Sequence, residues 1–98
     1  MKVLVTALLL SLPVTVLASA QLAQKNNCMA CHAVDKKLVG PSFKDIAAKY
    51  KGDPTAQEKL IAKVRKGGAG VWGPIPMPSH PSTNQAELEA ITKWILAQ

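Results

Sequence analysis

The sequence predicts a small all-α fold, and three observations favour it. Sequence patterns that start helices precede several segments, and turn residues separate these segments. No segment alternates apolar and polar residues as a half-buried strand does. The last part of the chain has apolar residues at the helical period, at Leu88, Ile91, Trp94 and Ile95. We therefore expect these four side chains to face a core between helices.

The first half of the chain predicts two short helices. Residues 21–27 form a helical lead into a pair of cysteines, and residues 36–40 form a loop. Ser42 and Asp45 resemble a capping box, in which a side-chain oxygen accepts a backbone N–H of the first turn. This box predicts a helix that runs to about Tyr50.

The second half predicts two longer helices. Asp53 and Pro54 suit the N-cap and first position of a helix that ends at Lys66, where two glycines stop it. Residues 67–81 then form a proline-rich loop. Residues 82–85 cap a final helix that continues to the C-terminus.

The N-terminal segment has the pattern of a secretory signal peptide. A basic start is followed by an apolar run over 3–17, and small residues occupy the −3 and −1 positions of a cut after Ala20. A permanent membrane anchor is less favoured because Pro13 interrupts the run. A cut after Ala18 is the nearest competing site. The sequence thus predicts two parts: a signal peptide, 1–20, and a single exported domain, 21–98.

The exported domain is basic and too small to rely on a core of side chains alone. Removing Lys2 leaves 11 of the 12 lysines and arginines against 6 acidic residues, a net charge of about +5. The lysines are scattered, so we expect no nucleic-acid partner. A domain this short usually needs a disulfide, a metal or a cofactor for stability. This one has only four aromatic residues to fill its core.

Residues 28–32 read Cys-Met-Ala-Cys-His, the attachment signature of c-type haem. On one helical turn Cys28, Cys31 and His32 share a face, so two thioethers form while the imidazole reaches the iron. A structural disulfide is the first alternative in an exported chain. A zinc site would need His80 as well, and adjacent Cys31 and His32 do not easily share a tetrahedron. We expect one haem c, covalently attached through both cysteines.

The second axial ligand decides the class of function, and Met29, Met77 and His80 are the candidates. Met29 lies between the cysteines, on the attached side. Met77 lies in a segment with four prolines in nine residues, which holds a thioether in place at little entropic cost. We favour Met77, with a distal site that is open or bound by His80 as the alternative. An open site would suit a haem peroxidase or a gas-binding sensor.

The mature chain resembles the small bacterial cytochrome c-551 (c8) group of class I cytochromes c, over nearly its whole length. This resemblance implies a fold of helices wrapped around one haem. The motifs that carry it are Cys28-Met29-Ala30-Cys31-His32, Val39-Gly40-Pro41, Val71-Trp72-Gly73-Pro74-Ile75-Pro76-Met77-Pro78 and Lys93-Trp94-Ile95-Leu96.

The resemblance also implies the parts of the haem site. His32 and Met77 bind the iron, and the Pro41 carbonyl accepts the ring N–H of His32. Trp72 lies near a haem propionate, where its indole N–H donates. Lys63 takes the place of an arginine that contacts a propionate in relatives, although a solvated helix face explains it equally well.

Two positions depart from the family's pattern. His80 stands where relatives usually carry an asparagine that donates to the methionine sulfur. Ala23 stands where an aromatic side chain normally packs on the last helix.

The resemblance further implies a monomeric periplasmic electron carrier and not an enzyme. Its donors would be a quinol-oxidising complex, and its acceptors a nitrite reductase or a terminal oxidase. Lys25, Lys36 and Lys37 flank the haem motif. We expect them to steer docking onto an acidic patch of the partner.

Overall fold

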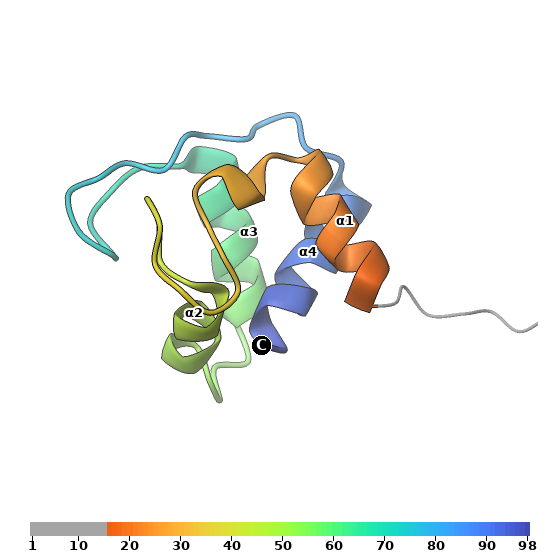
Figure 1. Cartoon of the computed structure of the whole chain (residues 1–98), viewed down its shortest axis with the longest axis horizontal. Coiled ribbons are helices and arrows are strands. Elements are labelled where there is room, and N and C mark those ends of the chain that lie inside the picture. Colours follow the sequence, from red (N-terminus) through yellow and green to blue (C-terminus); the bar gives the residue numbers. More distant parts are fainter. Residues whose placement is uncertain (1–15) are drawn as a thin grey trace, which may run out of the picture.

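The structure is a computed structural model, and it describes residues 16–98. In chain order its helices are α1 (Val16–Lys25), the 3₁₀ helix η1 (Cys28–Ala30), α2 (Phe43–Lys49), α3 (Ala56–Lys66) and α4 (Gln85–Leu96) (Figure 1). Within residues 16–98 there is no strand, only the isolated bridges His32–Lys37 and Gly68–Met77. The all-α prediction is confirmed.

Helix α4 is the centre of the fold, because α1, α2 and α3 all pack against it (Figure 1). Its predicted apolar face is confirmed, since Leu88, Ile91, Trp94 and Ile95 are all buried. The ring of Phe43, the first residue of α2, meets Trp94 edge to face at a centroid distance of 5.3 Å. The core cluster consists of Ala23, Phe43, Ile46, Leu60, Ile91, Trp94 and Ile95.

Helix α1 differs from the predicted helical lead at both ends. It begins upstream, at Val16, and it ends at Lys25 rather than Asn27. Asn27 adopts the left-handed conformation with φ 62°, which asparagine tolerates better than most residues, and so turns the chain into η1. Ala23 is fully buried in the α1–α4 contact, where the close approach of the helices leaves room for a methyl group.

The predicted cleavage site after Ala20 falls inside α1. Ser19, on its upstream side, is buried, and Ala20 packs against the core cluster. Most of the predicted signal peptide, residues 1–15, lies outside the described residues, so this boundary stays a prediction. Across residues 16–98, no helix is long and apolar enough to cross a membrane.

The start of α2 agrees with its capping box, whereas the start of α3 does not agree with the sequence prediction. Ser42 Oγ accepts the Asp45 N–H at 3.0 Å, as expected. Helix α3 begins two residues later than predicted, with Thr55 as its N-cap. The Asp53 carboxylate instead closes the preceding turn, accepting the N–H of Thr55 at 2.8 Å and its hydroxyl at 2.7 Å. Hydrogen bonds from Lys59 and then Thr55 lower the pKa of Asp53 to about 2.

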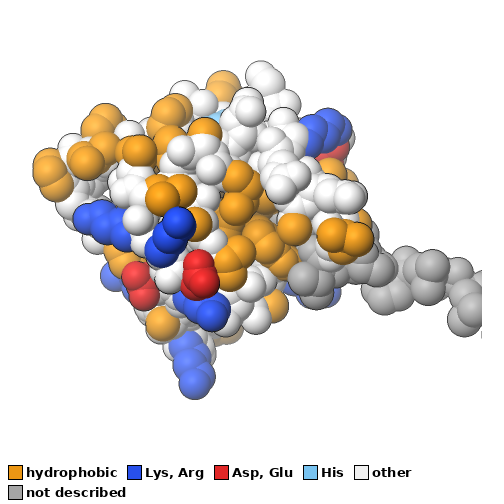
Figure 2. Space-filling model, in the orientation of Figure 1, with side chains coloured by type: hydrophobic (Ala, Val, Ile, Leu, Met, Phe, Trp, Pro, Cys, Tyr) orange, Lys and Arg blue, Asp and Glu red, His pale blue; other side chains and the backbone are white. Residues whose placement is uncertain are grey.

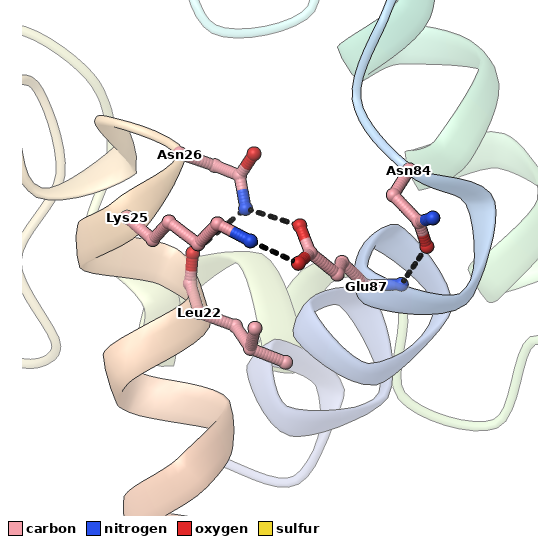
Figure 3. Close-up of polar contacts among 5 residues, drawn as sticks. All are labelled: Leu22, Lys25, Asn26, Asn84 and Glu87. Carbon is pink, nitrogen blue, oxygen red and sulfur yellow. Dashed lines mark hydrogen bonds and ion pairs between the residues drawn. The ribbon is translucent and has the colours of Figure 1, made fainter.

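Polar contacts at Glu87 join α1 to α4 beside the core (Figure 3). Lys25 Nζ lies 2.5 Å from Glu87 Oε1, and Asn26 Nδ2 donates to Glu87 Oε2 at 3.2 Å. The same Asn26 amide donates to the Leu22 carbonyl at 2.9 Å, and Asn84 caps α4 by accepting the Glu87 N–H at 3.1 Å. The bonds from Lys25 and Asn26 lower the pKa of Glu87 below its ordinary value of 4.5.

We predict that Glu87→Gln weakens the fold in a pH-dependent way. Because folding lowers the pKa of Glu87, its contribution is present above the unfolded pKa and is lost as the pH falls through the folded pKa. Urea unfolding from pH 7 down to pH 3 should therefore show wild type and variant converging at low pH. Glu58→Gln removes the same charge from an exposed position on α3 and serves as the control. The same pH profile for both variants would contradict this role of Glu87.

Candidate haem site

A cavity of about 590 Å³ lies between the haem motif, α2, α3, α4 and the 67–78 loop. This volume falls within the roughly 300–1,000 Å³ of pockets that hold small molecules and cofactors. Figure 2 shows hydrophobic side chains across the middle of one face of the molecule, with lysine or arginine side chains beside them at the lower left. Exposed apolar residues also line the cavity, namely Val39, Val71, Trp72 and Ile75.

The haem motif forms one tight helical turn, as its spacing predicts. The N–H groups of Cys31 and His32 both donate to the Cys28 carbonyl, at 3.3 and 3.0 Å. The two cysteines form no disulfide with each other, and both are half-buried and line the cavity together with His32. Burial raises the pKa of the Cys28 thiol. Two thiols and an imidazole on one wall of a largely apolar cavity suit a covalently attached haem.

His32 is the most constrained side chain of this wall. It is only 8% exposed, and its Nδ1 donates to the Pro41 carbonyl at 2.7 Å. Since a carbonyl only accepts, the proton belongs on Nδ1 and the lone pair of Nε2 remains for a metal. The ring stacks on Phe43 at a centroid distance of 5.2 Å, which ties it to the core. A Cβ at Gly40 would lie 2.5 Å from His32 Cε1, so only glycine fits beneath the ring.

Met77 lines the same cavity from the proline-rich loop. Met77 and Gly68 exchange two backbone hydrogen bonds, at 3.0 and 2.9 Å. Gly67 ends α3 at φ 67°, and a Cβ there would lie 2.7 Å from the Ser79 nitrogen. Of the other two candidate ligands, Met29 packs against the core cluster, and neither it nor His80 is among the lining residues within 16–98.

Trp72 and Lys63 both line the cavity and have protein partners of their own. Trp72 is 43% exposed, and the Lys49 ammonium lies 5.6 Å from the centre of its ring. Such a cation–π contact joins the end of α2 to the loop that carries Met77. Lys63 Nζ donates to the Gly68 carbonyl at 3.0 Å, which also accepts from Met77 N–H. The assignment of Trp72 and Lys63 to haem propionates stays a prediction.

The lysines around the motif are not equivalent in the structure. Lys25 pairs with Glu87, so its charge is largely compensated. Lys36 and Lys37 are exposed, and Lys37 lines the cavity. The sequence analysis missed Lys49 and the packing roles of Phe43 and Gly40. The only sequence signal for Gly40 is its place next to Pro41.

An attachment motif on one wall of a cofactor-sized cavity, within an all-α fold, defines a c-type haem protein. Comparison with known proteins agrees. The sequence model of the cytochrome c family matches residues 16–98. The cytochrome c-551 of Allochromatium vinosum is 50% identical over 80 residues, which cover 82% of this chain and 85% of that protein.

Solved structures show the same likeness. The crystal structure of wild-type Nitrosomonas europaea cytochrome c552 matches with a TM-score of 0.76 at 50% identity, over 80% of this chain and 96% of that one. The class 1 cytochrome MtoD of Sideroxydans lithotrophicus ES-1 matches with a TM-score of 0.74 at 35% identity, over 87% and 97% of the two chains.

The chain therefore belongs to the cytochrome c family, in its class I c-551 group. It is a small electron carrier with one haem c, attached covalently through Cys28 and Cys31. The described residues contain no cluster of three or more His, Cys, Asp or Glu side chains that would hold a metal ion by themselves.

We predict that Gly40→Ala disturbs the imidazole wall of the site. The new methyl group would press on the His32 ring, which Phe43 and Pro41 hold from other sides. We expect a loss of about 1–3 kcal/mol in the free energy of unfolding, as for other overpacked sites, together with an altered haem absorption spectrum. Thermal unfolding and the visible spectrum of the holoprotein test this. An unchanged melting temperature and spectrum would show that the ring shifts freely.

Proposed function

We propose that this protein is a periplasmic one-electron carrier whose haem iron is bound by His32 and Met77. When bound, the haem supplies an iron that accepts and releases one electron between its ferric and ferrous states. The protein's part would be to keep His32 and Met77 in place, so that few atoms move when the charge of the iron changes. It also covers the cofactor with apolar side chains.

One observation carries this proposal: a single cavity receives both His32, with its tautomer set by Pro41, and Met77. The alternatives are weaker, because a peroxidase or gas sensor needs an open distal position. Met77 lines that cavity, and its backbone N–H and carbonyl are both hydrogen-bonded to Gly68. Ligation by His80 would require a residue outside the described lining to move into it.

The setting of the protein is part of the proposal. A signal peptide over 1–20, cleaved after Ala20, would deliver the domain 21–98 to the periplasm, and the curated relatives are bacterial c-type cytochromes. We propose a monomer that takes electrons from a quinol-oxidising complex and passes them to a nitrite reductase or terminal oxidase. Exposed Val39, Val71 and Ile75 with nearby lysines would meet an acidic docking patch there.

We predict that Met77→Ala abolishes the methionine-to-ferric charge-transfer band and lets the reduced protein bind carbon monoxide rapidly. The matched control is Met29→Ala, which removes a methionine packed on the core and should keep the band. Absorption spectra of both variants give the answer. Persistence of the band in Met77→Ala, or rapid carbon monoxide binding by the wild type, would overturn the ligand assignment.

We also predict that lysines beside the cavity accelerate electron exchange with anions. Oxidation of the reduced protein by hexacyanoferrate(III), a small trianion, should slow as ionic strength rises. Lys36→Glu/Lys37→Glu should slow it roughly tenfold at low salt. Lys51→Glu/Lys93→Glu makes the same charge change but leaves Lys37, the member of the first pair that lines the cavity, in place, and should slow it less. Equal effects of the two pairs would show that only net charge matters.

A further inference from the structure

The loop that carries Met77 has few ways to hold itself in place. Prolines at 74, 76, 78 and 81 have no backbone N–H to donate. Among residues 74–83, only Met77 and His80 donate backbone N–H groups to backbone carbonyls, to Gly68 at 3.0 Å and to Val64 at 2.9 Å. Both acceptors belong to the end of α3 or to the residues just after it, so the position of the loop depends on that end of the helix.

The hydrogen bond from the His80 N–H also satisfies a carbonyl in the last turn of α3. The last four carbonyls of an α-helix have no partner within the helix. Gly67 N–H satisfies Lys63, and His80 N–H satisfies Val64 from the far side of Met77. The loop is therefore held at Met77, on Gly68 just beyond α3, and again three residues later, at His80, on Val64 of α3.

Arg65 extends this docking beyond His80. Its guanidinium donates three hydrogen bonds, to the Pro81 carbonyl at 3.1 Å, the Thr83 carbonyl at 2.6 Å and Gln85 Oε1 at 2.9 Å. These acceptors lie along the path by which the chain returns from the loop over the molecule to α4 (Figure 1). One side chain of α3 thus holds the return segment, residues 81–85, at three points.

The geometry requires arginine in particular. A guanidinium offers five N–H donors spread over a rigid plane, so it reaches acceptors on three residues together, whereas a lysine carries all its donors on one nitrogen. A basic residue in the last turn also interacts favourably with the helix dipole, but lysine would serve that purpose equally well. Arg65 is not among the lining residues of the cavity, so any effect on the cofactor passes through the loop.

We propose that Arg65 is a positioning residue for Met77. By fixing residues 81–85 on α3, it limits how far the loop opens and so how easily the thioether leaves the iron. The proposal rests on Met77 being the distal ligand, and it adds a residue that the haem motif and the cavity lining do not contain.

The test is displacement of the thioether by imidazole in the ferric holoprotein, followed through the charge-transfer band. At saturating imidazole the rate reports departure of Met77. We expect Arg65→Met to raise this limiting rate at least about tenfold, because tenfold is the factor for losing even one of its three hydrogen bonds from a charged group. Arg65→Lys, which restores one donor nitrogen, should fall between Arg65→Met and the wild type.

Two controls separate positioning from general stability. Glu87→Gln weakens the α1–α4 contact but removes none of the hydrogen bonds of Arg65, and Lys93→Met removes a positive charge from α4. Neither should change the limiting rate, even where Glu87→Gln lowers the melting temperature as much as Arg65→Met does. A wild-type rate in Arg65→Met, or equal acceleration by Glu87→Gln at equal loss of stability, would overturn the role of Arg65. A band that survives in Met77→Ala would instead overturn the ligand assignment on which it rests.

Discussion

The hydrogen bond from His32 Nδ1 to the Pro41 carbonyl joins two segments on which the rest of the site depends. It sets the tautomer of the imidazole and its orientation, and it brings Gly40 so close that a side chain there would collide with the ring. The His32 ring in turn lies against Phe43, whose other contact is Trp94 of the central helix. A local motif of five residues is thereby anchored in the core of the protein.

The Met77 side of the cavity is organised differently. Here the loop is stiff because of its prolines, and its contacts with α3 and with Gly68 hold it in place. Lys63 and the two backbone bonds at Gly68 hold its near end, while Arg65 holds its return path. The His32 wall is thus rigid because of packing, and the Met77 loop because of restricted backbone angles and hydrogen bonds.

Much of the fold and of the haem-motif wall could be predicted, because the sequence signals for them are local in the chain. Helix α4 and its buried face follow from the period of its apolar residues, and the wall with Cys28, Cys31 and His32 follows from one contiguous motif. The predicted start of α3 was wrong because an aspartate such as Asp53 can either cap a helix or close a turn. Only the structure shows from which N–H its carboxylate accepts a hydrogen bond. Residues 16–20, which the sequence assigns to the end of a signal peptide, form the start of α1 in the uncut chain, so the cleavage site stays a prediction.

The rest of the site depends on segments that meet only in the fold. The sequence places Gly40 beside Pro41 but gives no sign that the His32 ring lies against it. Arg65 is one of several basic residues on α3, and its acceptors are 16 to 20 positions away. Pro41 was expected only through the family resemblance, whereas Met77 was favoured because of the prolines around it; spacing alone relates neither residue to the haem motif.

The contrasting surroundings of the two tryptophans give the protein a pair of internal optical reporters. Trp94 is 7% exposed within the core, and Trp72 is 43% exposed at the cavity. Indole emission moves to longer wavelength as the ring meets water. Single-tryptophan variants would therefore distinguish local loosening near the cofactor from global unfolding, two events that haem absorption alone reports together.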